Sequence, residues 1–187
     1  MTIYRSLLFF LLIYFFCNKA YSDDKELIIN KLNNINNFSF NFIQTTNDKK
    51  ENGTCIIVFD NRMKCVYKNK NQKEIIVNNK TLAVILKRYN KISYYPISKS
   101  IFVNILKKSD LLNLIKTSTM GKNNGQISLK YLGGNDQIIR IIFDKKNFNL
   151  LGWKVNDQFN NEIDFSIKIF STNKLYNPDV FKIPTLN

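Results

Sequence analysis

The side chains that most often carry out chemistry are scarce in this sequence. The chain has 187 residues and no histidine. The commonest general base and metal ligand is therefore missing, and with it every Ser-His or Cys-His pair. Carboxylates that could work as an acid–base pair fall at predicted turns and strand starts rather than together: Asp144, Asp157, Glu162 and Asp164. We therefore expect no catalytic residue, and an exported carboxylate-based enzyme is the least favoured function.

Cys55 and Cys65 are the next candidates for chemistry. They lie ten residues apart and flank a predicted hairpin. An oxidising compartment would permit a disulfide, but spacing alone does not establish the geometry, so a disulfide and two buried thiols are both open. Two thiolates without a further soft ligand do not form a metal site, so we expect neither a metal nor another cofactor.

The first 22 residues have the pattern of a secretory signal peptide. Arg5 precedes an apolar run from Leu7 to Cys17, and Ala20 and Ser22 are small residues at the −3 and −1 positions of a cleavage site. The run is shorter than the roughly 20 residues of a membrane-spanning helix. We expect residues 1–22 to be cleaved and residues 23–187 to form a single exported domain, with a retained amphipathic anchor as the alternative.

The charge of the chain favours anionic partners. Its formal net charge is +14 at pH 7. In an exported protein, that charge attracts membrane head groups or acidic protein surfaces. The lysines are scattered along the sequence, however, which is also the pattern of an ordinary solvated surface. We expect no nucleic-acid partner, because export removes it and no basic-aromatic reader motif is present.

Residues 25–36 are predicted to form an amphipathic helix. Ile28, Leu32 and Ile35 recur at helical spacing, and Asp23 begins a capping-box pattern. This helix leads directly into a segment with a different period.

An aromatic stripe follows the helix. Phe38, Phe40 and Phe42 alternate with polar residues, so their three rings project from one face of a strand. A turn is predicted over residues 47–53. Further strands are predicted at residues 54–59, 63–67, 74–77, 82–87, 91–95, 126–132, 137–143, 150–155 and 162–170. An ordinary β-sandwich core also has such a stripe, so the stripe alone does not identify a ligand cavity.

Residues 101–115 interrupt the strands. Their apolar positions suit one or two helices, with a break at Ser109-Asp110, and residues 120–125 are predicted to form a flexible loop. About ten antiparallel strands, six before the helices and four after them, can form a half-open barrel whose concave side the helices cover.

Several motifs lie in the same order along nearly all of the expected mature chain. They are Phe38, Phe42 and Gln44 after the helix, a hairpin at residues 53–67, a strand and turn at residues 75–82, a late hairpin from residue 141 to residue 157, and a closing pattern of Asn173 with residues 177–184. In this order they resemble the periplasmic outer-membrane lipoprotein carrier family, LolA.

The resemblance implies a mainly β fold with helices, an unclosed antiparallel β-barrel covered by a short helical lid. It implies a monomeric periplasmic chaperone that shields the acyl chains of lipoproteins. Its partners would be these lipoproteins, the inner-membrane ABC-type complex that releases them and the outer-membrane receptor that accepts them. This lipid-binding role belongs to lipoprotein transport and outer-membrane biogenesis and makes no covalent bond.

Alternation and helical spacing select the residues expected at the lipid-binding cavity. From the sheet these are Phe38, Phe40, Phe42, Ile57, Met63, Leu82 and Trp153, and from the lid Ile101, Ile105, Leu112 and Ile115. Any one of them could instead be an ordinary core residue.

The sequence departs from the family in one hairpin. Many carriers have Arg-Pro there, and the arginine ties the lid to the barrel, whereas this chain has Phe59-Asp60. Arg62 lies three residues from that place, so what latches the lid is left open. Met63, where the family has an aromatic residue, is an apolar replacement of similar volume.

A related lipid- or lipoprotein-binding module is the alternative function. It could be an outer-membrane receptor, a glycolipid carrier or an envelope-stress sensor domain. A receptor would need a lipidated cysteine, and Cys17 follows bulky residues that do not suit lipidation.

Overall fold

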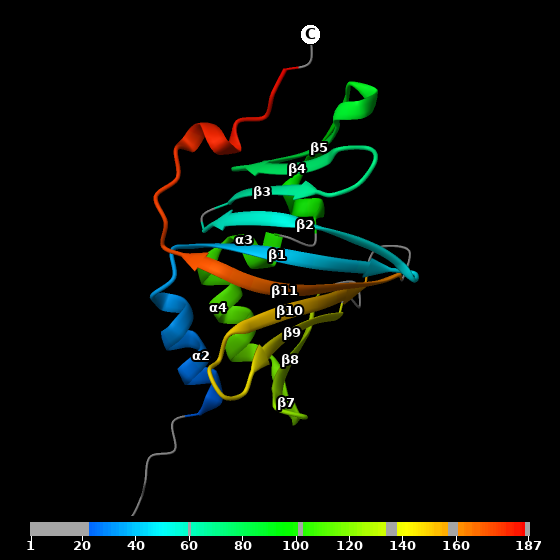
Figure 1. The fold of residues 1–187 in the computed structure, drawn as a ribbon. Helices are drawn as coiled ribbons and strands as arrows, with labels where there is room; N and C mark the ends of the chain where they lie inside the picture. The colour runs from blue at the N-terminus through cyan, green and yellow to red at the C-terminus, as the bar shows by residue number, and fades with distance from the viewer. Residues whose placement is uncertain (1–22, 60, 101–102, 134–137, 157–160, 186–187) are drawn as a thin grey trace, which may run out of the picture.

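The computed structural model describes residues 23–185 apart from residues 60, 101–102, 134–137 and 157–160 (Figure 1). The predicted signal peptide, residues 1–22, lies outside the described residues, and so do Ile101 and Asp157.

Eleven antiparallel strands form one sheet. Their bounds are β1 (Asn37–Thr46), β2 (Lys49–Val58), β3 (Arg62–Tyr67), β4 (Lys73–Asn78), β5 (Thr81–Leu86), β6 (Lys91–Pro96), β7 (Thr119–Asn123), β8 (Gln126–Leu132), β9 (Ile138–Asp144), β10 (Leu150–Asn156) and β11 (Glu162–Thr172). The order across the sheet is β6-β5-β4-β3-β2-β1-β11-β10-β9-β8-β7, so two meanders meet where β1 pairs with β11. The sheet does not close, and helices cover one of its faces (Figure 1). The predicted fold class, an open barrel with a helical lid, is confirmed.

Within the described residues, three α-helices accompany the sheet: α2 (Asp24–Asn33), α3 (Val103–Leu106) and α4 (Lys108–Thr117). The first confirms the predicted N-terminal helix, although it ends earlier, and the Asp23 carboxylate accepts a hydrogen bond from the Lys25 backbone N–H at 3.3 Å. Among the described residues, none of the helices combines the length and the apolar character needed to cross a membrane.

The break between the lid helices lies at Lys107, not at Ser109-Asp110 as predicted. Ser109 and Asp110 belong to the first turn of α4 instead, where an acidic side chain interacts favourably with the helix dipole. The described residues also form short 3-10 helices: η1 (Lys87–Tyr89), η2 (Ile97–Lys99) and η4 (Pro178–Phe181).

Residues 120–125 are not the predicted flexible loop. Most of them belong to β7, which pairs with β8 through a tight turn at Asn124 and Gly125, both with positive φ. All five residues of β7 are exposed, so they show no alternation of apolar and polar residues. The structure therefore describes five strands after the lid helices, not the predicted four.

The predicted turn at residues 47–53 is also shorter in the structure. Only Asn47 and Asp48 form the turn, and Gly53 lies within β2. A Cβ atom at Gly53 would lie 2.1 Å from the Val66 carbonyl oxygen and 2.8 Å from the Phe42 ring. Glycine is therefore required at this position by the close approach of β3 and of the aromatic stripe.

The C-terminal segment packs on the part of the opposite, outer face that β3, β4 and β5 form. Phe181 of η4 is fully buried, and the Arg62 guanidinium carbon lies 5.8 Å from the centroid of its ring. Ile183 packs on a small apolar cluster of Ile76, Ala83 and Ile85. Arg62 thus faces away from the lid and does not replace the family arginine.

A disulfide joins Cys55 of β2 to Cys65 of β3, which are directly paired across the two strands. Both residues are 1% exposed. Of the two alternatives that the sequence leaves open, the structure contains the disulfide.

Replacing both cysteines by alanine should lower the free energy of unfolding by about 2–3 kcal/mol, because the cross-link restricts the unfolded chain. Chemical denaturation of the two proteins measures the difference. Reduction of the wild-type protein should have the same effect, and an unchanged midpoint in both cases would contradict the prediction.

Gly152 fixes the distance between β10 and β11. Its φ is +154°, and a Cβ atom there would lie 1.9 Å from the Phe165 carbonyl oxygen. The register of β10 with β9 also shifts between Leu150 and Gly152, so Leu151 is the extra residue of a β-bulge. The bulge therefore bends β10 directly beside the close contact of Gly152 with β11.

Gly152→Ala should destabilise the protein by about 3 kcal/mol or more, because the methyl group meets backbone atoms that cannot move independently. Gly121→Ala is the matched control, since a Cβ atom at Gly121 meets nothing within 4 Å. Thermal unfolding of both variants tests the prediction, which fails if they unfold together.

Candidate functional site

The inner face of the sheet carries the seven residues expected at the cavity. They are Phe38, Phe40 and Phe42 of β1, Ile57 of β2, Met63 of β3, Leu82 of β5 and Trp153 of β10, and they are 0–6% exposed. All belong to one apolar cluster with the lid. Alternation thus predicts correctly that they share a face, and in this conformation the protein itself covers them.

Aromatic rings form a continuous surface across the middle of this face. Phe40 lies edge-on to Trp153, with 6.1 Å between ring centroids, and Trp153 stacks on Phe165 at 5.1 Å. Phe42 contacts Phe165 at 5.3 Å and Tyr67 at 4.9 Å. Sequence reasoning missed Phe165 and Tyr67, although the alternation of Phe165 with Ile167 in β11 was a usable signal.

Trp153 also brings a polar atom into this apolar surface. Its indole Nε1–H is buried and has no hydrogen-bond partner among the described residues. A buried donor without an acceptor costs about 1–3 kcal/mol. An acceptor on a bound molecule could remove this cost, so the inner face can offer one directed contact besides its apolar area.

The lid covers the aromatic surface with its apolar side. Of the lid residues expected at the cavity, Ile105 and Ile115 are fully buried, and Leu112 is half-buried and packs at the edge of the cluster. Leu111 and Leu114 of α4, which were not predicted, are buried as well.

Two lysines fasten the lid to α2, and each binds the C-terminal end of the other's helix. Lys25 Nζ of α2 donates to the backbone carbonyls of Lys116 and Ser118 at 3.1 and 2.7 Å. Lys108 Nζ of α4 donates to the Asn33 carbonyl at 3.2 Å. The two helices are therefore antiparallel and adjacent (Figure 1), and each ammonium group lies at the negative end of a helix dipole.

The hairpin in which the sequence lacks the family arginine contacts the lid in another way. Lys108 Nζ lies 5.3 Å from the centroid of the Phe59 ring, so the cation comes from the lid and the aromatic ring from the barrel. The Asn61 backbone N–H donates to the Leu106 carbonyl at 3.3 Å. These contacts, with those of Lys25, are polar contacts that join the lid to the barrel and to α2.

A polar network borders the aromatic surface at one end of β1. Tyr67 Oη donates to Gln44 Oε1 at 2.8 Å, and Lys73 Nζ lies 3.7 Å from the Tyr67 ring centroid. Burial and the nearby charge of Glu51 raise the pKa of Tyr67, so its hydroxyl stays protonated. Burial raises the pKa of Glu51, but hydrogen bonds from Lys73 and Asn69 together lower it overall.

Three of the four carboxylates considered for catalysis lie among the described residues, and each has a structural partner. Asp164 and Glu162 both pair with Lys154, at 2.7 and 3.3 Å, and the Asp164 hydrogen bond raises the pKa of Lys154. Asp144 accepts hydrogen bonds from the backbone of the β9–β10 turn. In the part of the chain that the structure describes, no group of three or more acidic or cysteine side chains is placed to hold a metal ion.

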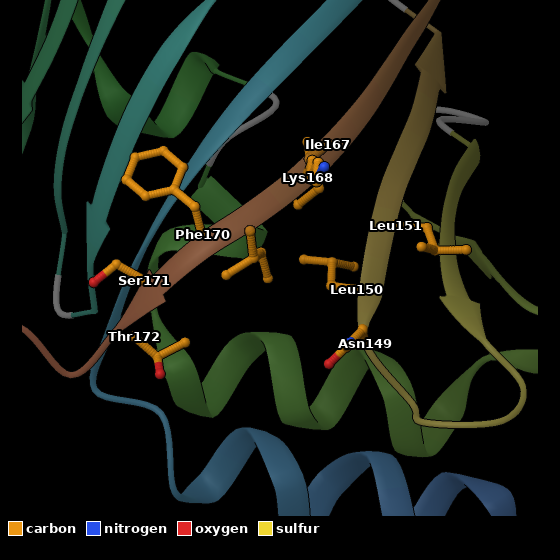
Figure 2. Close-up of a pocket in the computed structure, with 9 residues that line it drawn as sticks. Asn149, Leu150, Leu151, Ile167, Lys168, Phe170, Ser171 and Thr172 are labelled. Atoms are coloured by element: carbon orange, nitrogen blue, oxygen red, sulfur yellow. The ribbon is translucent and has the colours of Figure 1, made fainter.

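Two grooves open beside the aromatic surface. One, of about 510 Å³, lies between β10 and β11, with Leu150 pointing into it from β10 (Figure 2). The other, of about 370 Å³, lies under α2 and reaches Phe38 of the aromatic stripe. Such volumes fall in the range of about 300–1,000 Å³ that small-molecule sites occupy.

The family model of the outer membrane lipoprotein carrier protein LolA matches residues 33–184. No curated protein matches the chain. Among solved structures, an uncharacterized conserved protein from Thermus thermophilus aligns over 87% of this chain and 95% of its own, with a TM-score of 0.52 and 9% identity. This likeness shows the fold.

Two other structures align with lower TM-scores. A LolA superfamily protein from Nitrosomonas europaea gives 0.42, with 9% identity over 85% of this chain and 97% of its own. The MucA/MucB complex from Pseudomonas aeruginosa gives 0.46, with 9% identity over 87% of this chain and 62% of that one.

Replacing Lys25 and Lys108 by methionine should loosen the lid, because the hydrogen bonds from both ammonium groups are lost while the apolar stems remain. We expect faster amide hydrogen exchange in α4 and a loss of about 1 kcal/mol per lysine. Lys146→Met, on the exposed β9–β10 turn, is the control. Unchanged protection of α4 in the double variant would contradict this account of the lid.

Proposed function

Because this chain belongs to the outer membrane lipoprotein carrier protein family LolA, we propose that it is a periplasmic chaperone for lipoproteins. In this role it receives lipoproteins from an inner-membrane ABC-type releasing complex, shields their acyl chains during transit and delivers them to an outer-membrane receptor. It makes and breaks no covalent bond.

The observation that carries this proposal is the aromatic inner face under a short lid. An acyl chain exposed to water costs about 0.8 kcal/mol for each methylene group, so it needs an apolar surface of comparable extent for the whole passage. Seven buried residues from five strands of the sheet, among them Phe40 and Trp153, supply such a surface.

Loading requires the lid and the cargo to exchange places. Leu111, Leu114 and Ile115 of α4 now cover the surface that an acyl chain would use. When an acyl chain replaces α4 on this surface, one apolar contact is exchanged for another, so the net free energy of binding is modest. Modest binding suits a carrier that must also release its cargo. The acyl chain would therefore shift a population from the closed to the open state.

Two features support a location in the periplasm. Residues 1–22 have the pattern of a cleaved signal peptide. The Cys55–Cys65 disulfide persists in an oxidising compartment and is rare in a reducing one. The disulfide lies beside the aromatic stripe, next to Phe40 in the register of β1 with β2.

A release assay tests the proposal directly. The protein is incubated with ATP and spheroplasts that retain lipoproteins on the inner membrane, and the soluble fraction is analysed. We expect lipidated protein, but not an unlipidated variant of it, in a soluble complex with this chain. Co-purifying free lipid without any release would instead favour a lipid or glycolipid carrier of the same fold.

Phe42→Ala should reduce this release much more than Ile76→Ala. Both residues are almost completely buried, and each truncation costs about 2–5 kcal/mol of stability. Phe42 lies on the inner face, however, whereas Ile76 lies in the small outer cluster. Release is measured at a temperature at which circular dichroism shows both variants folded, and equal release by the two would count against the inner face as the acyl site.

A further inference from the structure

The sheet is split at one place between two strands that are neighbours in its order. The pairing of β10 with β11 runs from Asn156↔Glu162 to Gly152↔Ser166 and ends there. β11 continues to Thr172, and its residues beyond Ser166 are paired with β1 alone among the described strands. We call the resulting gap, between residues 149–151 and residues 167–172, the seam (Figure 2).

We propose that the seam is the passage by which an acyl chain reaches the inner face from the side, without prior removal of the lid. This inference rests on the proposed function and adds a route to it.

The local backbone places the seam at a defined position. Gly152 brings β10 into close contact with the Phe165 carbonyl, and the bulge at Leu151 then bends β10 away from β11. A second irregularity lies opposite, where the register of β1 with β11 skips Phe170. Both strands that border the seam are thus bent by an extra residue.

The walls of the seam are apolar and lead inward. Leu150 and Ile167, which line it, belong to the buried core, and Ile169 packs against that core. The groove under α2 shares Leu150 and Ile169 with the seam and extends to Phe38. Phe38 stacks on Phe40 with 5.5 Å between ring centroids, so apolar contacts run from the seam to the aromatic surface.

The rim of the two grooves suits the polar end of an acylated molecule. The described lining residues include Lys31 and Lys168 and no carboxylate. Lys31 Nζ of α2 donates to the Asn147 carbonyl and to Asn149 Oδ1, each at 2.6 Å, across the end of the groove. Phe170 adds an aromatic ring that is 58% exposed beside the seam.

The lid offers a more costly route than the seam. Lifting α4 breaks the hydrogen bonds of Lys25 and Lys108 and uncovers the aromatic surface to water before any cargo can replace the lid. A chain that enters through the seam reaches Phe38 first and can displace the lid from beneath while the surface stays covered. Apolar walls that lead to a buried aromatic surface favour an acyl chain over an added peptide strand as the occupant.

Closing the seam with a cross-link tests this route. The variant carries Leu151→Cys and Lys168→Cys, on opposite sides of the seam. It is exported to the bacterial periplasm, purified from it, and cross-linked with the shortest bis-maleimide that reacts with both cysteines. The control carries Lys154→Cys and Asp164→Cys, direct partners in the paired part of the same two strands, which the periplasm joins by a disulfide as it does Cys55 and Cys65. The native Cys55 and Cys65 are bonded to each other and do not react.

The readout is the association rate of a fluorescent triacylated lipopeptide, measured by stopped flow. We expect the seam cross-link to slow association at least about tenfold relative to the control, because uptake then requires the lid to open first. Thr172→Trp, which adds a ring at an exposed residue shared by both grooves, should slow it in the same direction without a cross-link.

Equal rates in the seam-linked and control-linked proteins, with no effect of Thr172→Trp, would overturn the inference. Binding of the same peptide without acyl chains, equally blocked by the cross-link, would assign the seam to a peptide strand and would also overturn it. If the wild-type protein takes up no lipopeptide at all, the proposed function fails, and this inference fails with it. If the wild-type protein takes up the lipopeptide and the seam cross-link does not slow uptake, only this inference fails and the proposed function stands.

Discussion

The aromatic inner face of the sheet cannot remain in contact with water, and the placement of the helices follows from this constraint. α4 covers it with Leu111, Leu114 and Ile115. The contact across this interface is apolar and has little directional preference, so another apolar body can replace the helix. The directional contacts lie at the rim, where lysine ammonium groups meet helix ends. The lysine contacts at the edge of the lid therefore fix its position. The apolar contact between α4 and the sheet determines which molecules can replace the helix.

The latch in this protein differs in chemistry from the arginine of the family pattern. Phe59 occupies the place expected for that arginine and receives a cation from Lys108 of the lid. In this protein the lid supplies the cation and the barrel supplies the aromatic ring. A lysine on a flexible stem holds by a point charge, without the planar bidentate geometry of an arginine. Such a contact can be broken and remade with little geometric demand.

Much of the fold could be predicted from local patterns, and the differences arise where distant neighbours decide the structure. The alternation of Phe38, Phe40 and Phe42 predicts the inner face because burial imposes that period. β7 escaped prediction because it is an edge strand whose residues are all exposed, and its pairing comes from β8. Gly53 looked like a turn residue, but it is a strand glycine required by Val66 and Phe42.

Several sheet residues of the candidate site were predicted, but Phe165, Tyr67 and the closure of the site were not. Alternation brought Trp153 and Phe42 to one face, yet the lysine latches join residues far apart in sequence and carry no local signature. The seam depends on the register of β10 with β9 and of β11 with β1. A register is a property of two paired strands, so the sequence of one strand does not predict it. A glycine beside the bulge, Gly152, can be read from the sequence. Its close contact with the Phe165 carbonyl depends on strand pairing and cannot.

The pairing of β1 with β11 joins the first of the described strands to the last of them. While the polypeptide is being made, or is crossing a membrane N-terminus first, β1 can find β2 early, but its other edge waits until the final strand arrives. During that interval Phe40 and its neighbours lie on an unfinished sheet with an open edge, the state most prone to aggregation. Closing such a distant contact is also slow. A chain with such an aromatic face must therefore itself be protected from aggregation while it is still being completed.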